Sequence, residues 1–144
     1  MTPRVTGLWR HPIKSHGREA LTSVRLEAGA TMPWDRTWAV AHDASDVDGS
    51  AWAHCRNFTI GSKAPGLMAI DARLDDATGT VTLSHPDLPD LIIDPDKDGD
   101  ALIAWSRPLQ PENRAQSARV VRVPGRGMTD TDFPSVSIGN MASH

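Results

Sequence analysis

Two basic residues lie in turns that the sequence predicts between β-strands. Lys14 belongs to HPIKSHGRE (11–19), directly after the run 4–10, and Arg36 belongs to PWDRTWAV (33–40), directly before another run. Lysine offers a compact charge and arginine a planar fork of donors, so the two together suit a phosphate or another oxyanion. Successive N–H groups of the KSHG turn would add a backbone nest for the same anion.

A simpler interpretation competes with this anion site. Lys14 and Arg36 are then two surface charges, with Arg36 paired to Asp35 or to another carboxylate. Strand ends on a rigid β framework are where loops usually carry function, which keeps the anion site open as a hypothesis.

Three other patterns give weaker chemical signals. DPDKDGD (94–100) opens like a calcium-binding loop, but Trp105 stands where the bidentate glutamate is needed, so we expect an acidic turn. His54 and Cys55 are neighbours whose side chains would point to opposite faces of a strand, which favours a structural or incidental cysteine. The GRG sequence at 125–127 is too short to indicate phosphate binding by itself.

Composition excludes several classes of protein. The chain has 144 residues, a net charge of −3 and one cysteine. That length suits one domain, or one domain with part of a second. The charge argues against a general nucleic-acid binder, and the absence of an apolar run of about 18 residues argues against a transmembrane helix. We expect no nucleic acid and no membrane as partners, and a reducing cytoplasm as the location.

The elements that must position Lys14 and Arg36 are short β-strands. Glycine and proline, eleven of each, interrupt the chain too often for long helices. Seven β-like runs separated by turns predict a mainly β fold, an antiparallel β-barrel or barrel-like sandwich with little helix. The predicted strands are 4–10, 22–28, 37–43, 66–74, 79–85, 90–95 and 118–123.

Other stretches give secondary expectations. Segment 106–117 is predicted to hold one or two helical turns after Pro111, or to be a polar excursion. Residues 135–144 resemble a strand followed by a helix start with Asn140 as its N-cap, from which we expect the chain to be cut inside a larger fold. The tryptophans near polar turns are expected to be exposed, namely Trp34, Trp52 and Trp105.

Several motifs together resemble those of MOSC-domain proteins. L-W-x-x-P-I-K-S-x-x-x-E-x-L, then D-R-x-W-x-V, then G-L-M-A-I are similar to the N-terminal β-barrel of that family over residues 4–85. TDTDFPSVSIGNMAS (129–143) resembles the segment that opens the MOSC core. The family includes the C-terminal domain of molybdenum-cofactor sulfurase and the mitochondrial amidoxime-reducing component.

The resemblance implies a cofactor and a set of residues that hold it. Such proteins bind molybdopterin, whose phosphate and pterin lie between the N-terminal barrel and the MOSC core. The lysine and serine of P-I-K-S and the arginine of D-R-x-W correspond here to Lys14, Ser15 and Arg36. Asp132 and Ser143 match positions near that cleft.

The resemblance also implies a division of the chain and of its function. Residues 1–126 would form the N-terminal barrel and residues 127–144 the start of the MOSC core, whose remainder would be a partner. Cofactor binding would belong to this chain. Reduction or sulfur transfer, with an electron-transfer or sulfur-donor protein as a further partner, would belong to the complete protein. The alternative is a non-catalytic barrel that docks a protein partner through its tryptophans.

The chain departs from the family pattern at four places. His16 stands where a cysteine often follows P-I-K-S, and Trp34 replaces the glycine before D-R-x-W. Arg56 is the nearest equivalent of an arginine that usually precedes the next strand. The cysteine that carries sulfur or binds molybdenum belongs to the MOSC core, and Cys55 is not its counterpart. No catalytic residue is therefore assigned to this chain.

Overall fold

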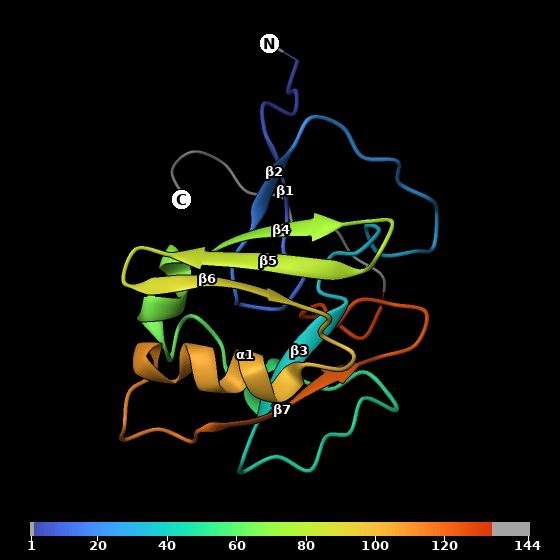
Figure 1. The fold of residues 1–144 in the computed structure, drawn as a ribbon. Helices are drawn as coiled ribbons and strands as arrows, with labels where there is room; N and C mark the ends of the chain where they lie inside the picture. Colours follow the sequence, from blue (N-terminus) through green and yellow to red (C-terminus); the bar gives the residue numbers. More distant parts are fainter. Residues whose placement is uncertain (1, 134–144) are drawn as a thin grey trace.

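The chain folds into three small antiparallel sheets. A computed structural model of the 144 residues describes residues 2–133. Strands β1 (Leu8–Arg10) and β2 (Glu19–Leu21) form a hairpin, and β3 (Trp38–His42) pairs with β7 (Ser117–Arg122). Strands β4 (Asp71–Asp75), β5 (Thr80–His85) and β6 (Leu88–Ile93) form the third sheet (Figure 1). The mainly β, barrel-like sandwich predicted from the sequence is confirmed.

The loop 11–18 between β1 and β2 touches both other sheets. Ile13 forms a parallel bridge with Trp38 of β3, and Arg18 forms one with Asp71 of β4. The segment that carries Lys14 is therefore the place where the three sheets meet. A loop held by backbone bonds on both sides is a rigid support for functional side chains.

Strand β3 runs between two clusters of buried side chains. Trp38 and Val40 face a cluster with β5, β6 and the helix, whereas Ala39 and Ala41 face a cluster with β7. Successive residues of a strand point to opposite faces, so a strand buried on both sides needs a continuous apolar run. The sequence WAVA supplies it, and the strand predicted at 37–43 is confirmed.

One α-helix covers the β3–β7 sheet, and the sequence analysis missed it. Helix α1 (Gly99–Ser106) packs Leu102 and Ile103 against β6 and β7 (Figure 1). A 3-10 turn, η3 (Arg107–Leu109), continues it, so the helical residues lie before Pro111 and not after it. The polar excursion applies only to the residues that follow.

The acidic segment 94–98 forms the predicted turn, and its carboxylates have internal partners. Asp94 and Asp98 accept backbone N–H bonds within the segment. Asp96 accepts the indole N–H of buried Trp38 at 2.8 Å and pairs with Arg122 at 2.9 Å. The turn therefore satisfies a polar group of the core.

One strand prediction is wrong, and a second, at 66–74, is correct only in its later part. No strand forms over 22–28, where Leu26 is 53% exposed. The first residue of β1, Leu8, pairs with Leu21, so the residues after Leu21 have no partner strand in β1. Residues Pro65–Ala69 form a 3-10 helix, η2, with proline in its first turn, and the strand starts only at Asp71. The hairpin predicted around DDATG is confirmed by β4 and β5, with Gly79 at φ 73° in the turn.

The exposure expected for three tryptophans is not found. Trp34, Trp52 and Trp105 are all half-buried. The indole N–H groups of Trp52 and Trp105 donate to the carbonyls of Thr129 and Pro89, each at 2.7 Å. Trp34 stacks on Trp38 with ring centroids 5.8 Å apart. Each of these large rings lies next to a polar turn and packs partly into the core. Each also has a hydrogen bond or a ring partner, which makes this partial burial favourable.

Residues 127–129 belong to the same packed unit as β3. Met128 is fully buried in the cluster of Ala39 and Ala41, and its N–H donates to the carbonyl of Arg36 at 2.7 Å. The domain boundary between residues 126 and 127 stays a prediction. Across residues 2–133, no helix has both the length and the apolar character needed to cross a membrane.

Candidate functional site: the Lys14 cleft

The two predicted basic turns are joined by backbone hydrogen bonds. The N–H of Lys14 donates to the carbonyl of Trp38 at 2.8 Å, and the N–H of Trp38 donates to that of Pro12 at 3.2 Å. The N–H of Arg36 donates to the carbonyl of His11 at 2.5 Å. The segments 11–14 and 36–38 therefore run alongside each other, and this brings residues 22 positions apart in sequence to one place.

Backbone strain is concentrated in these turns. Within residues 2–133, the non-glycine residues with positive φ are Ser15 at 63°, Trp34 at 64° and Arg36 at 50°. A left-handed conformation costs an L-residue about 1–2 kcal/mol, and such residues cluster at functional sites. Two of the three are residues that the sequence analysis assigned to the anion site.

Lys14, Ser15 and Arg36 line one cleft of about 600 Å³, which we call the Lys14 cleft. The basic side chains of its lining are Lys14, Arg18 and Arg36, and the carboxylate of the lining is Asp130. An apolar wall comes from Leu67, Met68 and Ile70, and Cys55 lies beside it. Three permanent cations stand against two carboxylates, Asp130 in the lining and Asp35 paired with Arg36, which leaves the cleft with an excess of positive charge.

Lys14 is nearly buried, and its ammonium group has two partners. Its side chain is 5% exposed, and Nζ donates to Asp130 Oδ1 at 2.5 Å and to the carbonyl of Met128 at 3.2 Å. A buried charge is costly unless it is paired, so Asp130 compensates Lys14. The carboxylate itself is 67% exposed, at the rim of the cleft.

Arg36 forms an ion pair with the neighbouring residue Asp35. The guanidinium Nη1 donates to Asp35 Oδ2 at 2.7 Å, and Asp35 Oδ1 accepts the backbone N–H of His11 at 2.8 Å. The pairing with Asp35 that the sequence left open is therefore present. The ion pair with Asp35 uses one nitrogen of the Arg36 guanidinium, and Arg36 still lines the cleft. The pair therefore orients the guanidinium and leaves its other N–H groups for a ligand.

The positive field of the cleft is visible in two pKa shifts. Burial lowers the pKa of His11, and the charges of Arg36, Arg18 and Lys14 lower it further, against an opposing effect of Asp35. The hydrogen bond from Lys14 lowers the pKa of Asp130, and the charges of Lys14 and Arg36 add to this effect. Both groups respond to the same cluster of cations, which favours an anion in the cleft.

His16 stands in sequence between Ser15 and Gly17, which line the cleft, and its own side chain is fully buried. Its Nδ1–H donates to the carbonyl of Lys14 at 2.8 Å, and Nε2 has no hydrogen-bond partner. Burial lowers the pKa of His16 to about 4, so the ring is neutral at pH 7. This neutral ring fixes the carbonyl of the residue that carries the ammonium group.

The remaining residues that the sequence analysis singled out are Asp132, Ser143 and Arg56. Asp132 does not line the Lys14 cleft and pairs with Arg126 at 3.2 Å. Ser143 lies outside the described residues. Arg56 is exposed and lines a different cleft, described below.

Asp130 and Cys55 are cleft residues that the sequence analysis missed. Asp130 stands two positions before Asp132 in TDTD, and spacing alone cannot tell which carboxylate reaches Lys14. Cys55 enters the wall of the cleft because the 3-10 turn η1 (Cys55–Asn57) turns it there, with Sγ 3.7 Å from Nδ1 of His54. Within the described part of the chain, no group of three or more metal-ligating side chains comes together.

The fold and the cleft define a class of protein. It is a barrel-like domain of short antiparallel strands with a cationic cleft at the ends of β1 and β3. The chain matches the family model described as MOSC N-terminal beta barrel domain over residues 2–134. The chain therefore belongs to the MOSC N-terminal beta barrel family. Comparisons with curated proteins and with solved structures gave no match.

Proposed function

We propose that this chain is a cofactor-binding module that supplies anion contacts to molybdopterin through Lys14, Ser15 and Arg36. The single observation that carries the proposal is that these residues, from two separate turns, line one electropositive cleft. The family membership agrees with this role, because MOSC proteins are associated with the molybdenum cofactor.

The residues of the cleft fit the chemistry of that group. The ammonium of Lys14, the fork of Arg36 and the hydroxyl of Ser15 suit a phosphate. The apolar wall at Leu67 and Met68 suits the flat face of a pterin, and a volume of about 600 Å³ lies within the usual range of ligand sites. Molybdopterin, when bound, supplies the metal chemistry, whereas this chain would bind and orient it.

Reduction or sulfur transfer belongs, under this proposal, to the complete protein. The remainder of the MOSC core would form the other wall of the site, and an electron-transfer or sulfur-donor protein would be a further partner. The part that we assign to this chain is the binding and orientation of the cofactor. A cytoplasmic location is part of the same proposal.

Titration with molybdopterin tests the proposal. We expect Lys14→Ala and Arg36→Ala each to weaken binding about tenfold or more, because each removes a charge-assisted hydrogen bond worth about 1.5–3 kcal/mol. The control is Lys97→Ala, an exposed lysine outside the cleft. Unchanged affinity in both cleft variants would contradict the site.

The alternative function, docking of a protein partner, was based on exposed tryptophans. Trp34, Trp52 and Trp105 are half-buried and engaged with the core or with backbone carbonyls. No other observation on the described residues favours a particular protein partner over the cofactor.

A further inference from the structure

A second cleft adjoins segment 60–64, and Ile60 lines both this cleft and the Lys14 cleft. We call it the Arg114 cleft. Its volume is about 260 Å³, below the usual range of about 300–1,000 Å³ for ligand sites, so its ligand would be smaller than a drug-sized molecule. The apolar part of its lining comes from Phe58, Ile60, Ala64 and Pro111.

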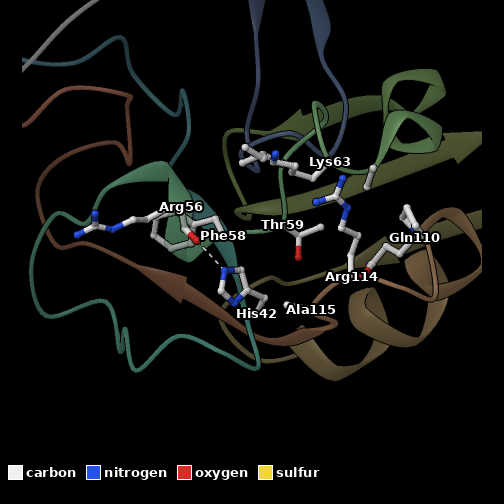
Figure 2. Close-up of a pocket in the computed structure, with 11 residues that line it drawn as sticks. His42, Arg56, Phe58, Thr59, Lys63, Gln110, Arg114 and Ala115 are labelled. Atoms are coloured by element: carbon white, nitrogen blue, oxygen red, sulfur yellow. Dashed lines mark hydrogen bonds between the residues drawn. The ribbon is translucent and has the colours of Figure 1, made fainter.

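Two basic side chains converge on this cleft. Lys63 and Arg114 both line the cleft from separate turns, and in Figure 2 the guanidinium of Arg114 extends toward Lys63, whereas that of Arg56 points away. No carboxylate lines the cleft, and neither Lys63 nor Arg114 makes an ion pair within residues 2–133. Two like charges facing one cavity repel each other, and an anion between them would remove that cost.

Both turns that carry these cations are fixed by hydrogen bonds. The N–H groups of Lys63 and Ala64 both donate to the carbonyl of Ile60, at 3.1 and 3.0 Å. The side-chain amide of Gln116 donates to the carbonyls of Pro111 and Arg114, at 3.0 and 2.9 Å. Binding between two ordered turns costs less conformational entropy than binding that has to order them.

The other polar groups of the cleft are already satisfied. His42 donates from Nε2 to the carbonyl of Arg56 at 2.6 Å (dashed in Figure 2) and accepts the N–H of Ala44 at its Nδ1. The hydroxyl of Thr59 shares a hydrogen bond of 2.8 Å with that of Ser117. Lys63 and Arg114 are therefore the groups left to contact a ligand.

We propose that the Arg114 cleft binds a small organic monocarboxylate with an apolar body. The carboxylate would lie between Lys63 and Arg114, where the planar fork of arginine matches its geometry. The body would contact Phe58 and Ile60, which an inorganic anion could not use. This site is separate from the Lys14 cleft and does not depend on the function proposed for it.

Titration of the 144-residue chain with benzoate, followed by amide NMR shifts, tests this inference. We expect saturable shifts at Phe58 and Thr59. Lys63→Gln and Arg114→Gln should each weaken benzoate binding about tenfold, because each removes one charged hydrogen bond. Both side chains are exposed, so the variants are expected to fold.

Matched controls separate this site from general charge effects. Lys97→Gln removes an exposed lysine outside the cleft and should leave benzoate binding unchanged. Benzyl alcohol, which keeps the ring without the charge, should bind at least tenfold more weakly. The inference is overturned if benzoate gives no saturable shift at Phe58 and Thr59, if benzyl alcohol binds equally well, or if Lys97→Gln weakens binding as much as Lys63→Gln.

Discussion

Lys14 differs from a surface lysine in that its charge is enclosed. Its ammonium is held by one exposed carboxylate and one carbonyl, while its backbone is bonded to β3. Asp130 therefore occupies the position on Lys14 that an external anion would take. We therefore expect the residue that compensates the lysine in this structure to compete with a ligand as well.

Asp130→Asn tests this competition. The substitution keeps the shape and an oxygen acceptor but removes the negative charge, so we expect the Lys14 cleft to bind molybdopterin about two- to fivefold more tightly, in line with the small energies of exposed ion pairs. Asp132→Asn is the control, because Asp132 pairs with Arg126 and not with Lys14. Equal affinities of Asp130→Asn and the unsubstituted chain would show that Asp130 does not compete.

His16 predicts a dependence of stability on pH. Burial lowers its pKa from the ordinary value of 6.5 to about 4 in the folded chain, so between these pH values the unfolded chain binds a proton that the folded chain does not. The free energy of unfolding should therefore fall as the pH decreases from 6.5 to 4, by about 3 kcal/mol in total. Urea denaturation at a series of pH values measures this slope.

His16→Asn isolates the contribution of this one group. Asparagine does not titrate and can still donate to the carbonyl of Lys14, so the slope between pH 6.5 and 4 should become shallower. The comparison is the unsubstituted chain, measured over the same series of pH values. An unchanged slope in His16→Asn would mean that another group causes the pH dependence.

At the scale of elements, the loop 11–18 is the part that makes the site. It connects β1 and β2, bridges to β3 at Ile13 and to β4 at Arg18, and carries Lys14 and Ser15. Its path requires Gly17, at φ 95°, where an added Cβ would lie 2.7 Å from Cγ2 and 2.9 Å from the carbonyl oxygen of Ile70.

Gly17→Ala should therefore destabilise the fold strongly. The positive φ costs about 1–2 kcal/mol, and the contact with Ile70 adds about 1–3 kcal/mol. Gly29→Ala is a matched control, because Gly29 also has a positive φ, at 76°, but nothing lies within 4 Å of its added Cβ. Urea denaturation should give a larger loss for Gly17→Ala, and equal losses would show that the loop can move away from Ile70.

Short sequence patterns predict those strands and turns whose structure depends on a few neighbouring residues. The apolar run of β3 and the DDATG hairpin were found because burial on both faces and turn chemistry are visible in a few residues. The segment 22–28 alternates equally well, but its pairing depends on the length of β1, which alternation does not encode. Helix α1 was missed because eight residues after an acidic turn are too few for a clear helical period.

The candidate site shows the same division. The residue types of Lys14, Ser15 and Arg36 and their places at strand ends could be read from the sequence. Their meeting in one cleft depends on bridges between distant segments. Asp130 was missed for the same reason, because its contact with Lys14 spans 116 positions.

On the scale of the whole molecule, three small sheets meet around one loop and leave two clefts with different chemistry. The Lys14 cleft combines cations with an exposed carboxylate, whereas the Arg114 cleft has cations and an apolar lining without an acid. Segment 60–64 contributes to both. We propose that each of these two clefts binds an anion, and ligands should distinguish them.

The most direct test of the central claim is to map molybdopterin onto the chain by amide NMR shifts. We predict that Ser15, Gly17 and Ser62, which line the Lys14 cleft, shift with one common affinity, and that Lys14→Ala weakens this affinity about tenfold or more. Lys63 and Ala64, in the Arg114 cleft, should shift little. Shifts confined to Lys63 and Ala64, or shifts at Ser15 that keep the same affinity in Lys14→Ala, would contradict the account.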